Sequence, residues 1–316
     1  MDFTIFLPVI AFFILGIVAS LSQSRLEIPQ PIAKFLSIYL LIAIGLKGGV
    51  EISHHPFTQE MVKLIVLVIS LSIVIPFIWF FVLKNYLSVV DAAAVAATFG
   101  SVSAITFVTA IDFLQSMNIH FDGYMIAMMV LMESPPIIVG ILLANVFSAQ
   151  QKALNWKELL HEAFFNHAIL LLLGGLVIGF VISEPGYLPL KPFFETPFKG
   201  VLTLFILDMG LMVGRRLKDV FNLGTSLMLF SFLIPFFNAL IGIGLSHWMG
   251  LQPGNSLLLT ILCAGASYIA VPAALSLSLP QANHSLYLTM SLALTFPFNL
   301  ILGIPLYYKI IQMTAS

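Results

Sequence analysis

The feature that most constrains this chain is a succession of apolar runs, each close to 20 residues long. About 20 apolar residues cross the hydrocarbon core of a bilayer as a helix. Ten such runs occur, bounded by charged residues, prolines or polar clusters. We therefore predict an all-α polytopic membrane protein with ten transmembrane helices. The predicted spans are 3–22, 31–48, 61–83, 89–112, 122–147, 163–183, 197–214, 223–247, 255–278 and 285–310.

The composition excludes a water-soluble fold. Of the 316 residues, 60% are hydrophobic and only 9% are Asp, Glu, Lys or Arg, whereas a soluble domain has about 25% charged residues. The net charge of −1 gives no basic surface for nucleic acid. The N-terminal Met1-Asp2-Phe3 lacks the basic region of a cleaved signal peptide, so the first run is expected to remain as a span.

The distribution of Lys and Arg predicts the orientation in the membrane. These residues favour cytoplasmic loops. The connections after odd-numbered spans carry eight of them and the opposite side carries five. This bias favours both termini outside and a cytoplasmic linker at 148–162.

The two halves of the chain share a pattern at a constant offset of 165 residues. Gly45 and Gly210 begin similar segments at the ends of spans 2 and 7, and Gly100 and Gly265 fall inside spans 4 and 9. Units of five spans, an odd number, must have opposite topology, as in alternating-access secondary transporters. The predicted organisation is a first five-helix repeat at 1–147, a linker at 148–162 and a second, inverted five-helix repeat at 163–316.

Spans 4 and 9 are predicted to be broken helices. Glycine and proline weaken a helix, and irregular backbone at membrane depth is tolerated only beside a protein-buried cavity. Two half-helix N-termini there would suit a small anion. The alternative is that the small residues only permit close packing and the hydroxyls bond their own backbone. The predicted substrate-binding residues are Gly100, Ser101, Ser103, Gly265, Ala266 and Ser267.

Intramembrane carboxylates give a second signal. Glu133 follows Asp122 by eleven residues, which is about 16 Å along a helix and close to the midplane. A carboxylate at that depth usually marks an ion or proton path, the alternative being a protonated structural residue. Asp208 lies seven residues before Arg215 and either pairs with it or takes part in transport. Together with the Thr106 hydroxyl, which can coordinate Na⁺, Glu133 and Asp208 are the predicted cation-coupling residues.

Other polar residues are expected to have structural roles. Asp91 is expected as an N-terminal charge of span 4, and Asp112 as loop polarity at its other end. His54 and His55 lack a third ligand at metal spacing, so no metal site and no organic cofactor is predicted. The absence of a Gly-rich phosphate loop, a Ser-His-Asp order or HExxH gives no support for an enzyme.

Four short motifs lie in a fixed order between about residues 30 and 308. They are Gly-Leu-Lys-Gly-Gly at 45–49, Phe-Gly-Ser-Val-Ser at 99–103, Met-Glu-Ser-Pro at 132–135 with Ala144-Asn145, and Pro-Gln-Ala-Asn at 280–283. Their order and spacing resemble the cyanobacterial-type sodium-dependent bicarbonate transporter family, that of the SbtA-like permeases.

This resemblance implies Na⁺-coupled bicarbonate uptake by an elevator-type alternating-access mechanism. It implies a gate domain of helices 1, 2, 6 and 7 and a moving core domain of helices 3–5 and 8–10. It also implies homotrimers among the lipids of a bacterial cytoplasmic (inner) membrane. Bicarbonate and Na⁺ would bind beside the broken helices, at the positions of Gly100, Ser101, Ser103, Thr106, Gly265, Ala266 and Ser267.

The chain also departs from that family. Tyr268 stands where the family has an Asp after a Ser-rich run, and Glu133 matches a family Asp. Only 148–162 joins the halves, so the family's long cytoplasmic loop, where a P-II-like regulatory partner would bind, is absent. The alternatives are a Na⁺- or H⁺-coupled carrier of small organic carboxylates, comparable to bile-acid/sodium symporters, and a non-transporting sensor on the same fold.

Overall fold

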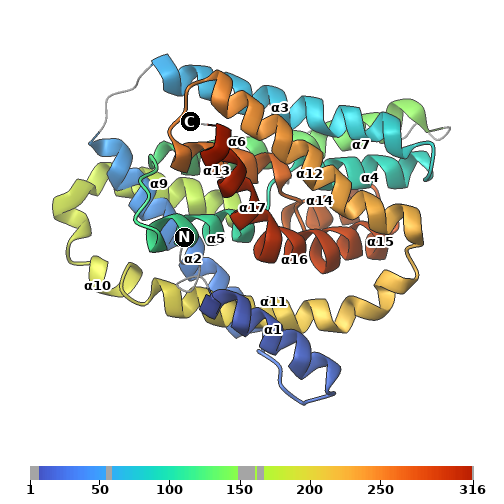
Figure 1. Ribbon diagram of the computed structural model, residues 1–316, viewed down its shortest axis with the longest axis horizontal. Coiled ribbons are helices and arrows are strands. Elements are labelled where there is room, and N and C mark those ends of the chain that lie inside the picture. Colours follow the sequence, from blue (N-terminus) through green and yellow to red (C-terminus); the bar gives the residue numbers. More distant parts are fainter. Residues whose placement is uncertain (1–6, 55–58, 149–160, 162–166, 315–316) are drawn as a thin grey trace.

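A computed structural model describes residues 7–54, 59–148, 161 and 167–314 (Figure 1). Every regular element within these ranges is helical, in agreement with the predicted all-α class. Eight segments of the described chain are long and apolar enough to cross a membrane, and each coincides with a predicted span. The first and ninth predicted spans coincide with shorter apolar helices, Leu7–Leu21 and Pro253–Ala264.

The last long segment is wound partly as π-helix on both sides of Pro297, which cannot donate a backbone hydrogen bond.

The elements are α1 (Leu7–Leu21), α2 (Gln30–Ser53), α3 (Gln59–Leu83), α4 (Val89–Gly100), α5 (Ala104–Ser116), α6 (Tyr124–Glu133), α7 (Pro135–Phe147), α9 (His167–Tyr187), α10 (Lys191–Phe194), α11 (Phe198–Phe221), α12 (Thr225–Trp248), α13 (Pro253–Ala264), α14 (Ala270–Ser278), α15 (His284–Leu288), η2 (Thr289–Thr295), α16 (Phe296–Phe298), η3 (Asn299–Gly303) and α17 (Ile304–Thr314).

Glycines bring two pairs of helices into backbone contact. Gly49 of α2 lies against the backbone of Leu176 in α9, and Gly16 of α1 lies against the carbonyl of Leu207 in α11. A methyl group at either glycine would overlap the neighbouring backbone, so small residues fix these pairs. We call α1, α2, α9 and α11 the frame; its helices occupy the left and lower parts of Figure 1.

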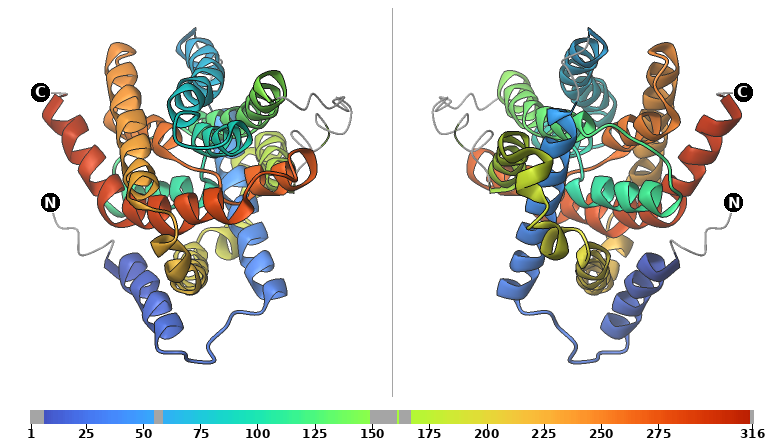
Figure 2. Two further views of the ribbon diagram at one scale, coloured as in Figure 1. Left: turned by 90° about the vertical axis from the view of Figure 1, so that its right-hand side faces the viewer. Right: turned by 90° about the vertical axis from the view of Figure 1, so that its left-hand side faces the viewer.

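The other long helices form a second packing group, which we call the bundle. In the bundle α3 packs on α4 and α7, α12 packs on α13, and α13 contacts α5 and α17. Figure 2 shows α3 and α12 standing at the end of the molecule opposite α1. The bundle meets the frame where α2 packs against α6 and α11 packs against η2.

The helix break predicted in span 4 is present. α4 ends at Gly100, and the chain leaves the helical conformation before α5 begins. A Cβ atom on Gly100 would lie 2.6 Å from Cδ of Pro76 in α3, so the bend needs glycine for close packing. Ser103 caps the new helix by accepting a hydrogen bond from the backbone N–H of Thr106.

The helix break predicted in span 9 is also present, at residues 265–269. A Cβ atom on Gly265 would lie 2.9 Å from the backbone nitrogen of Ser103. The backbone N–H of Ser267 donates a hydrogen bond to the carbonyl of Thr98 at 2.9 Å. The two breaks therefore lie directly against each other, although they are far apart in the sequence.

The prediction that Asp112 is loop polarity is wrong. The apolar pattern of α5 continues to Ser116, and the chain turns only near Asn118, where φ is 55°. Asp112 therefore lies within a helix, with a side chain that is 5% exposed. Asp91 does lie in the first turn of α4 and donates its backbone N–H to the Ser88 hydroxyl, as expected of an N-terminal charge.

The predicted linker 148–162 lies outside the described residues except for Ser148 and His161. His55 also lies outside them. The step at Pro135-Pro136 separates two described helices, because α6 ends at Glu133 and α7 begins at Pro135.

Candidate substrate site between the two helix breaks

A small cavity lies where the two breaks meet, and we call it the break cavity. Its wall is formed by α2, both breaks and the end of α6. Ser103, Ser267 and Glu133, three of the residues predicted from sequence, line it together. The other lining residues are Ser37, Leu41, Val102, Ala104, Ile105, Tyr268, Ile269 and Ala270.

Two helices begin at the break cavity. The first residues of α5 and α14, Ala104 and Ala270, are both part of its wall. The N–H groups at a helix start lack intrahelical partners and carry the positive end of the helix dipole, so they favour a negative charge. None of the described lining residues is Lys, Arg or His. The attraction for an anion therefore comes from helix ends and neutral donors.

The two serines of the cavity are held in place by the helices they cap. The Ser103 hydroxyl oxygen accepts hydrogen bonds from the Thr106 N–H at 3.2 Å and the Thr106 hydroxyl at 2.8 Å. The Ser267 oxygen accepts one from the Val271 N–H at 3.2 Å. A hydroxyl has one hydrogen to donate besides its two lone pairs. Both serines can therefore still donate a hydrogen bond to a bound anion.

The remaining substrate residues predicted from sequence adjoin the cavity without lining it. Ser101 donates its hydroxyl to the Glu133 carbonyl at 2.8 Å, which joins the first break to the end of α6. Gly100 and Gly265 allow the close backbone contacts described above. Ala266, which follows Gly265 in the sequence, is 3% exposed. These residues shape the wall, and Ser103 and Ser267 present polar atoms to its interior.

Glu133 is the only charged residue among the described residues that line the cavity. Glu133 is 3% exposed, and its Oε2 atom has no hydrogen-bond partner in the described chain. A buried carboxylate is costly unless it is paired, protonated or bound to a cation. This carboxylate therefore has an open position for a cation or a proton.

Tyr268 is a lining residue that the site prediction from sequence did not include. It is 8% exposed, and its hydroxyl is buried without a hydrogen-bond partner in the described chain. The sequence feature that could have identified Tyr268 is its position directly after Ser267, where the family that the chain resembles has an Asp. A tyrosine in an apolar span is usually packing, so the sequence alone gave no reason to choose it.

Asp208, predicted for cation coupling, is not brought into the break cavity. It lies in α11 and is 8% exposed, and it interacts electrostatically with Arg215 on the same helix. Thr106 likewise does not line the cavity, since its hydroxyl is donated to Ser103. Of the three predicted coupling residues, Glu133 alone reaches the cavity.

A larger pocket, which we call the charged pocket, lies between α2 and α11 of the frame and α5 and α6 of the bundle. The Nζ atom of Lys199 lies 3.7 Å from Oδ2 of Asp112 and 2.9 Å from Oγ of Ser116. The Nζ atom of Lys47 lies 3.1 Å from Oε1 of Glu195. The acidic, basic and histidine residues in its described lining are Lys47, Glu51, Asp112, His120, Glu195 and Lys199.

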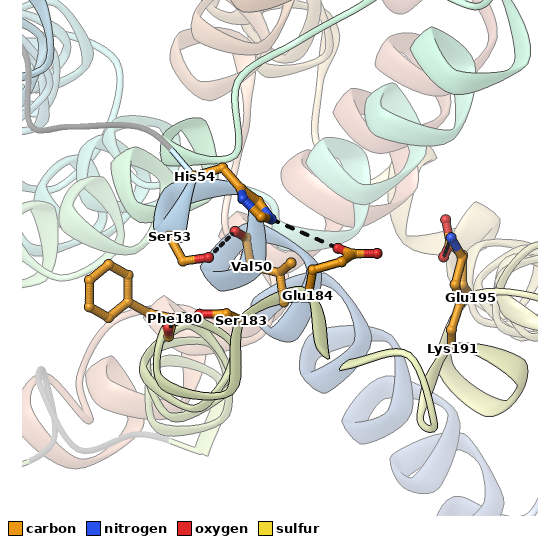
Figure 3. A network of polar contacts seen from close by, with 8 residues as sticks. All are labelled: Val50, Ser53, His54, Phe180, Ser183, Glu184, Lys191 and Glu195. Carbon is orange, nitrogen blue, oxygen red and sulfur yellow. Dashed lines mark hydrogen bonds and ion pairs between the residues drawn. The ribbon is translucent and has the colours of Figure 1, made fainter. Parts of the chain in front are cut away.

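Figure 3 shows further ion pairs, one between the ends of α2 and α9 and one at α10. His54 Nε2 lies 3.9 Å from Oε2 of Glu184, next to a kink where Ser183 has a φ of 52°. Lys191 Nζ lies 3.4 Å from Oε2 of Glu195. Within the described ranges, no three His, Cys, Asp or Glu side chains are grouped to hold a metal ion.

Comparison with known families agrees with the resemblance in the motifs. A family model described as the Na⁺-dependent bicarbonate transporter superfamily matches residues 8–312. This range contains both helix breaks and Glu133. No curated protein matches the chain.

Proposed function

Because the chain belongs to the Na⁺-dependent bicarbonate transporter superfamily, we propose that it takes up bicarbonate together with Na⁺ as a secondary active transporter. The family and the eight apolar helices of spanning length make it an integral membrane protein of a transporter family, and the family's coupling ion is Na⁺. The proposal adds two points to this family membership: that this chain itself takes up bicarbonate, and that bicarbonate binds at a particular site.

The proposed substrate site is the break cavity. Bicarbonate would bind between the N-termini of α5 and α14, with the hydroxyls of Ser103 and Ser267 as donors. The observation that carries the proposal is the presence, in one small cavity, of two helix N-termini and the unpartnered carboxylate oxygen of Glu133. The helix ends suit an anion, whereas the carboxylate suits a cation.

This arrangement offers a physical basis for coupling. Without a cation, the Glu133 carboxylate would repel an anion placed in the same low-dielectric cavity. A Na⁺ ion bound at the carboxylate removes that repulsion and adds an attraction, so each ion favours binding of the other. We confine the proposed coupling position to Glu133, because Thr106 and Asp208 do not line the cavity.

We propose the elevator architecture on the basis of the two packing groups. The frame corresponds to the gate domain and the bundle to the moving core domain, in two inverted five-helix repeats. Backbone contact at Gly16 and Gly49 supports a rigid frame, and the cavity wall combines Ser37 and Leu41 of the frame with residues of the bundle. The proposed setting is a homotrimer in the bacterial inner membrane, with both termini outside.

The test is uptake of labelled bicarbonate into proteoliposomes that contain the purified protein. We expect uptake to rise with an inward Na⁺ gradient and to be unaffected by an inward proton gradient of the same size. Cation-driven uptake of labelled pyruvate or acetate that bicarbonate does not inhibit would select an organic carboxylate carrier instead. Absence of uptake of any small anion under every cation gradient would contradict a transport role and leave a sensor.

A further inference from the structure

Tyr268 stands out among the residues that the proposed function does not use. It lies in the second break, directly after Ser267, and lines the break cavity. Its hydroxyl is buried and has no hydrogen-bond partner in the described chain. Tyrosine hydroxyls usually find a partner when they are buried, because an unpaired buried hydroxyl costs free energy. This hydroxyl therefore requires an explanation.

The ring of Tyr268 is held in a fixed orientation. It packs edge-on against Phe296, with ring centroids 5.4 Å apart and an angle of 64° between the rings. Phe296 in turn packs edge-on against Phe13 of α1, with centroids 5.6 Å apart. The contact with Phe296, which is itself backed by Phe13, therefore fixes the ring with its hydroxyl close to the side chain of Ser103, which lines the same cavity. Within the described chain no partner lies at hydrogen-bond distance and angle from this hydroxyl.

The donors in the cavity can be counted against the acceptors. Ser103 and Ser267 use lone pairs to accept hydrogen bonds from the first turns of α5 and α14, and each keeps one hydrogen. Ser37 of α2 also has a hydroxyl in the lining. Tyr268 has its hydrogen free. Among the described lining residues, Glu133 is the only charged acceptor. One side of the site therefore holds neutral donors, and the described lining contains no cationic side chain to which an anion could pair.

We propose that the Tyr268 hydroxyl donates a hydrogen bond to an oxygen of the transported anion. With Ser103 and Ser267 it forms a neutral donor set for a small, singly charged oxyanion. This inference rests on the proposed function, since it concerns the substrate of the same cavity. A doubly charged anion such as sulfate would be disfavoured, because the charge of Na⁺ is already balanced by the Glu133 carboxylate, so a singly charged anion adds one uncompensated charge to the cavity and sulfate adds two.

The experiment compares Tyr268→Phe with the wild type in bicarbonate uptake. The substitution removes one oxygen atom and keeps the ring that packs on Phe296. We expect the KM for bicarbonate to rise about ten-fold or more, the value of one hydrogen bond to a charged group. The Na⁺ concentration for half-maximal uptake, measured at saturating bicarbonate, should stay unchanged. A purely structural role would alter both constants or neither.

The matched control is Tyr308→Phe. Tyr308 is a buried tyrosine in α17 that does not line the cavity, and its hydroxyl accepts a hydrogen bond from Gln312. We expect this variant to keep the KM of the wild type. If Tyr268→Phe cannot be purified as folded protein, Phe296→Leu displaces the ring while retaining the hydroxyl, and it should raise the KM for bicarbonate as well.

A second measurement separates this inference from the proposed function. Thermal stabilisation of the purified protein is measured with bicarbonate, formate, nitrate and sulfate in the presence of Na⁺. We expect the three singly charged anions to stabilise the wild type more than sulfate, and Tyr268→Phe to lose most of that effect. Missing Na⁺-driven uptake with this binding pattern intact contradicts the proposed function alone. Equal stabilisation of wild type and Tyr268→Phe, or none of either, overturns the inference.

Discussion

The break cavity and the charged pocket both lie against α2 and α5, but they differ in whether their charged side chains have partners of opposite charge. In the charged pocket Lys47 pairs with Glu195, and Lys199 pairs with Asp112. In the break cavity Glu133 and Tyr268 each have a buried oxygen without a hydrogen-bond partner in the described chain. In the charged pocket opposite charges lie side by side, although Asp112 Oδ2, 3.7 Å from Lys199 Nζ, is also buried without a hydrogen-bond partner in the described chain. The described lining of the break cavity holds one charged residue and no opposite charge.

This difference teaches where to look for a ligand. A charge that is paired within the protein holds two elements together, and a ligand must break that pair in order to bind it. An unpartnered buried group has already lost its hydration, so a ligand that satisfies it recovers free energy. Charge density alone would have directed attention to the charged pocket. The buried Glu133 carboxylate, which has no opposite charge among the described lining residues, directs it to the break cavity.

The largest effect should come from removing the one charge of the break cavity. Glu133→Gln should lower Na⁺-driven uptake by about 100-fold or more, because a desolvated cation loses its charged partner. The measurement is initial uptake at several Na⁺ concentrations. The matched variant in the charged pocket is Glu51→Gln, for which we expect a change of less than about two-fold. Similar losses in both variants would erase the distinction between the two cavities.

A steric change at the contact between the breaks should have the next largest effect. Gly265→Ala places a Cβ atom 2.9 Å from the backbone nitrogen of Ser103, so the breaks must separate. We expect about a ten-fold loss of uptake, since a small misplacement of binding groups is enough to weaken a preorganised site. Gly200→Ala in α11 is the control, because a Cβ atom there meets nothing within 4 Å. Normal uptake in Gly265→Ala would show that the contact is not needed.

The ion pair of the charged pocket should affect stability more than transport. Lys199→Gln leaves the nearly buried Asp112 carboxylate without its partner, so the unfolding temperature should fall by about 3 °C or more. The double variant Lys199→Gln/Asp112→Asn should recover part of this loss, because it removes the unpaired charge as well. Additive losses in a thermal unfolding assay of the single and double variants would argue against the pair.

The smallest effect is expected at the end of α2 shown in Figure 3. His54 and Glu184 are 3.9 Å apart, with side chains 53% and 46% exposed. Exposed pairs of this kind contribute about 0–1 kcal/mol, so His54→Gln should leave both uptake and unfolding temperature within error of the wild type. A clear loss in either measurement would mean that this cluster takes part in the cycle.

Much of the fold could be predicted, because apolar run length and helix-breaking residues are local signals. Gly100 and Gly265 each mark a break at the position where the helix ends. Glu133, predicted to lie inside a span, is 3% exposed, and its depth in the membrane stays a prediction. By contrast, the inverted topology and the domain division remain predictions, since they depend on how the whole chain crosses the membrane.

The partners of the polar side chains could not be predicted. Ser101 donates to a carbonyl 32 residues away, and Asp112 meets Lys199 from another helix. A sequence shows which residues share a helix face, but not which helix lies opposite that face. The same reason explains why Tyr268 was missed and Asp208 was included: burial was expected for both, and only the fold decides which one faces the cavity.

The glycine contacts of the frame join helices from the two halves of the chain, so these helices can pack together only late in synthesis. α2 ends at Ser53 and its partner α9 begins at His167, so a ribosome needs on the order of ten seconds to progress from one to the other. During that time Gly49 faces lipid or other chains, while α3 and α4 can already pack on each other. α1 and α2 therefore remain in the bilayer without α11 and α9, the helices that their glycines contact, until the second half of the chain has been made.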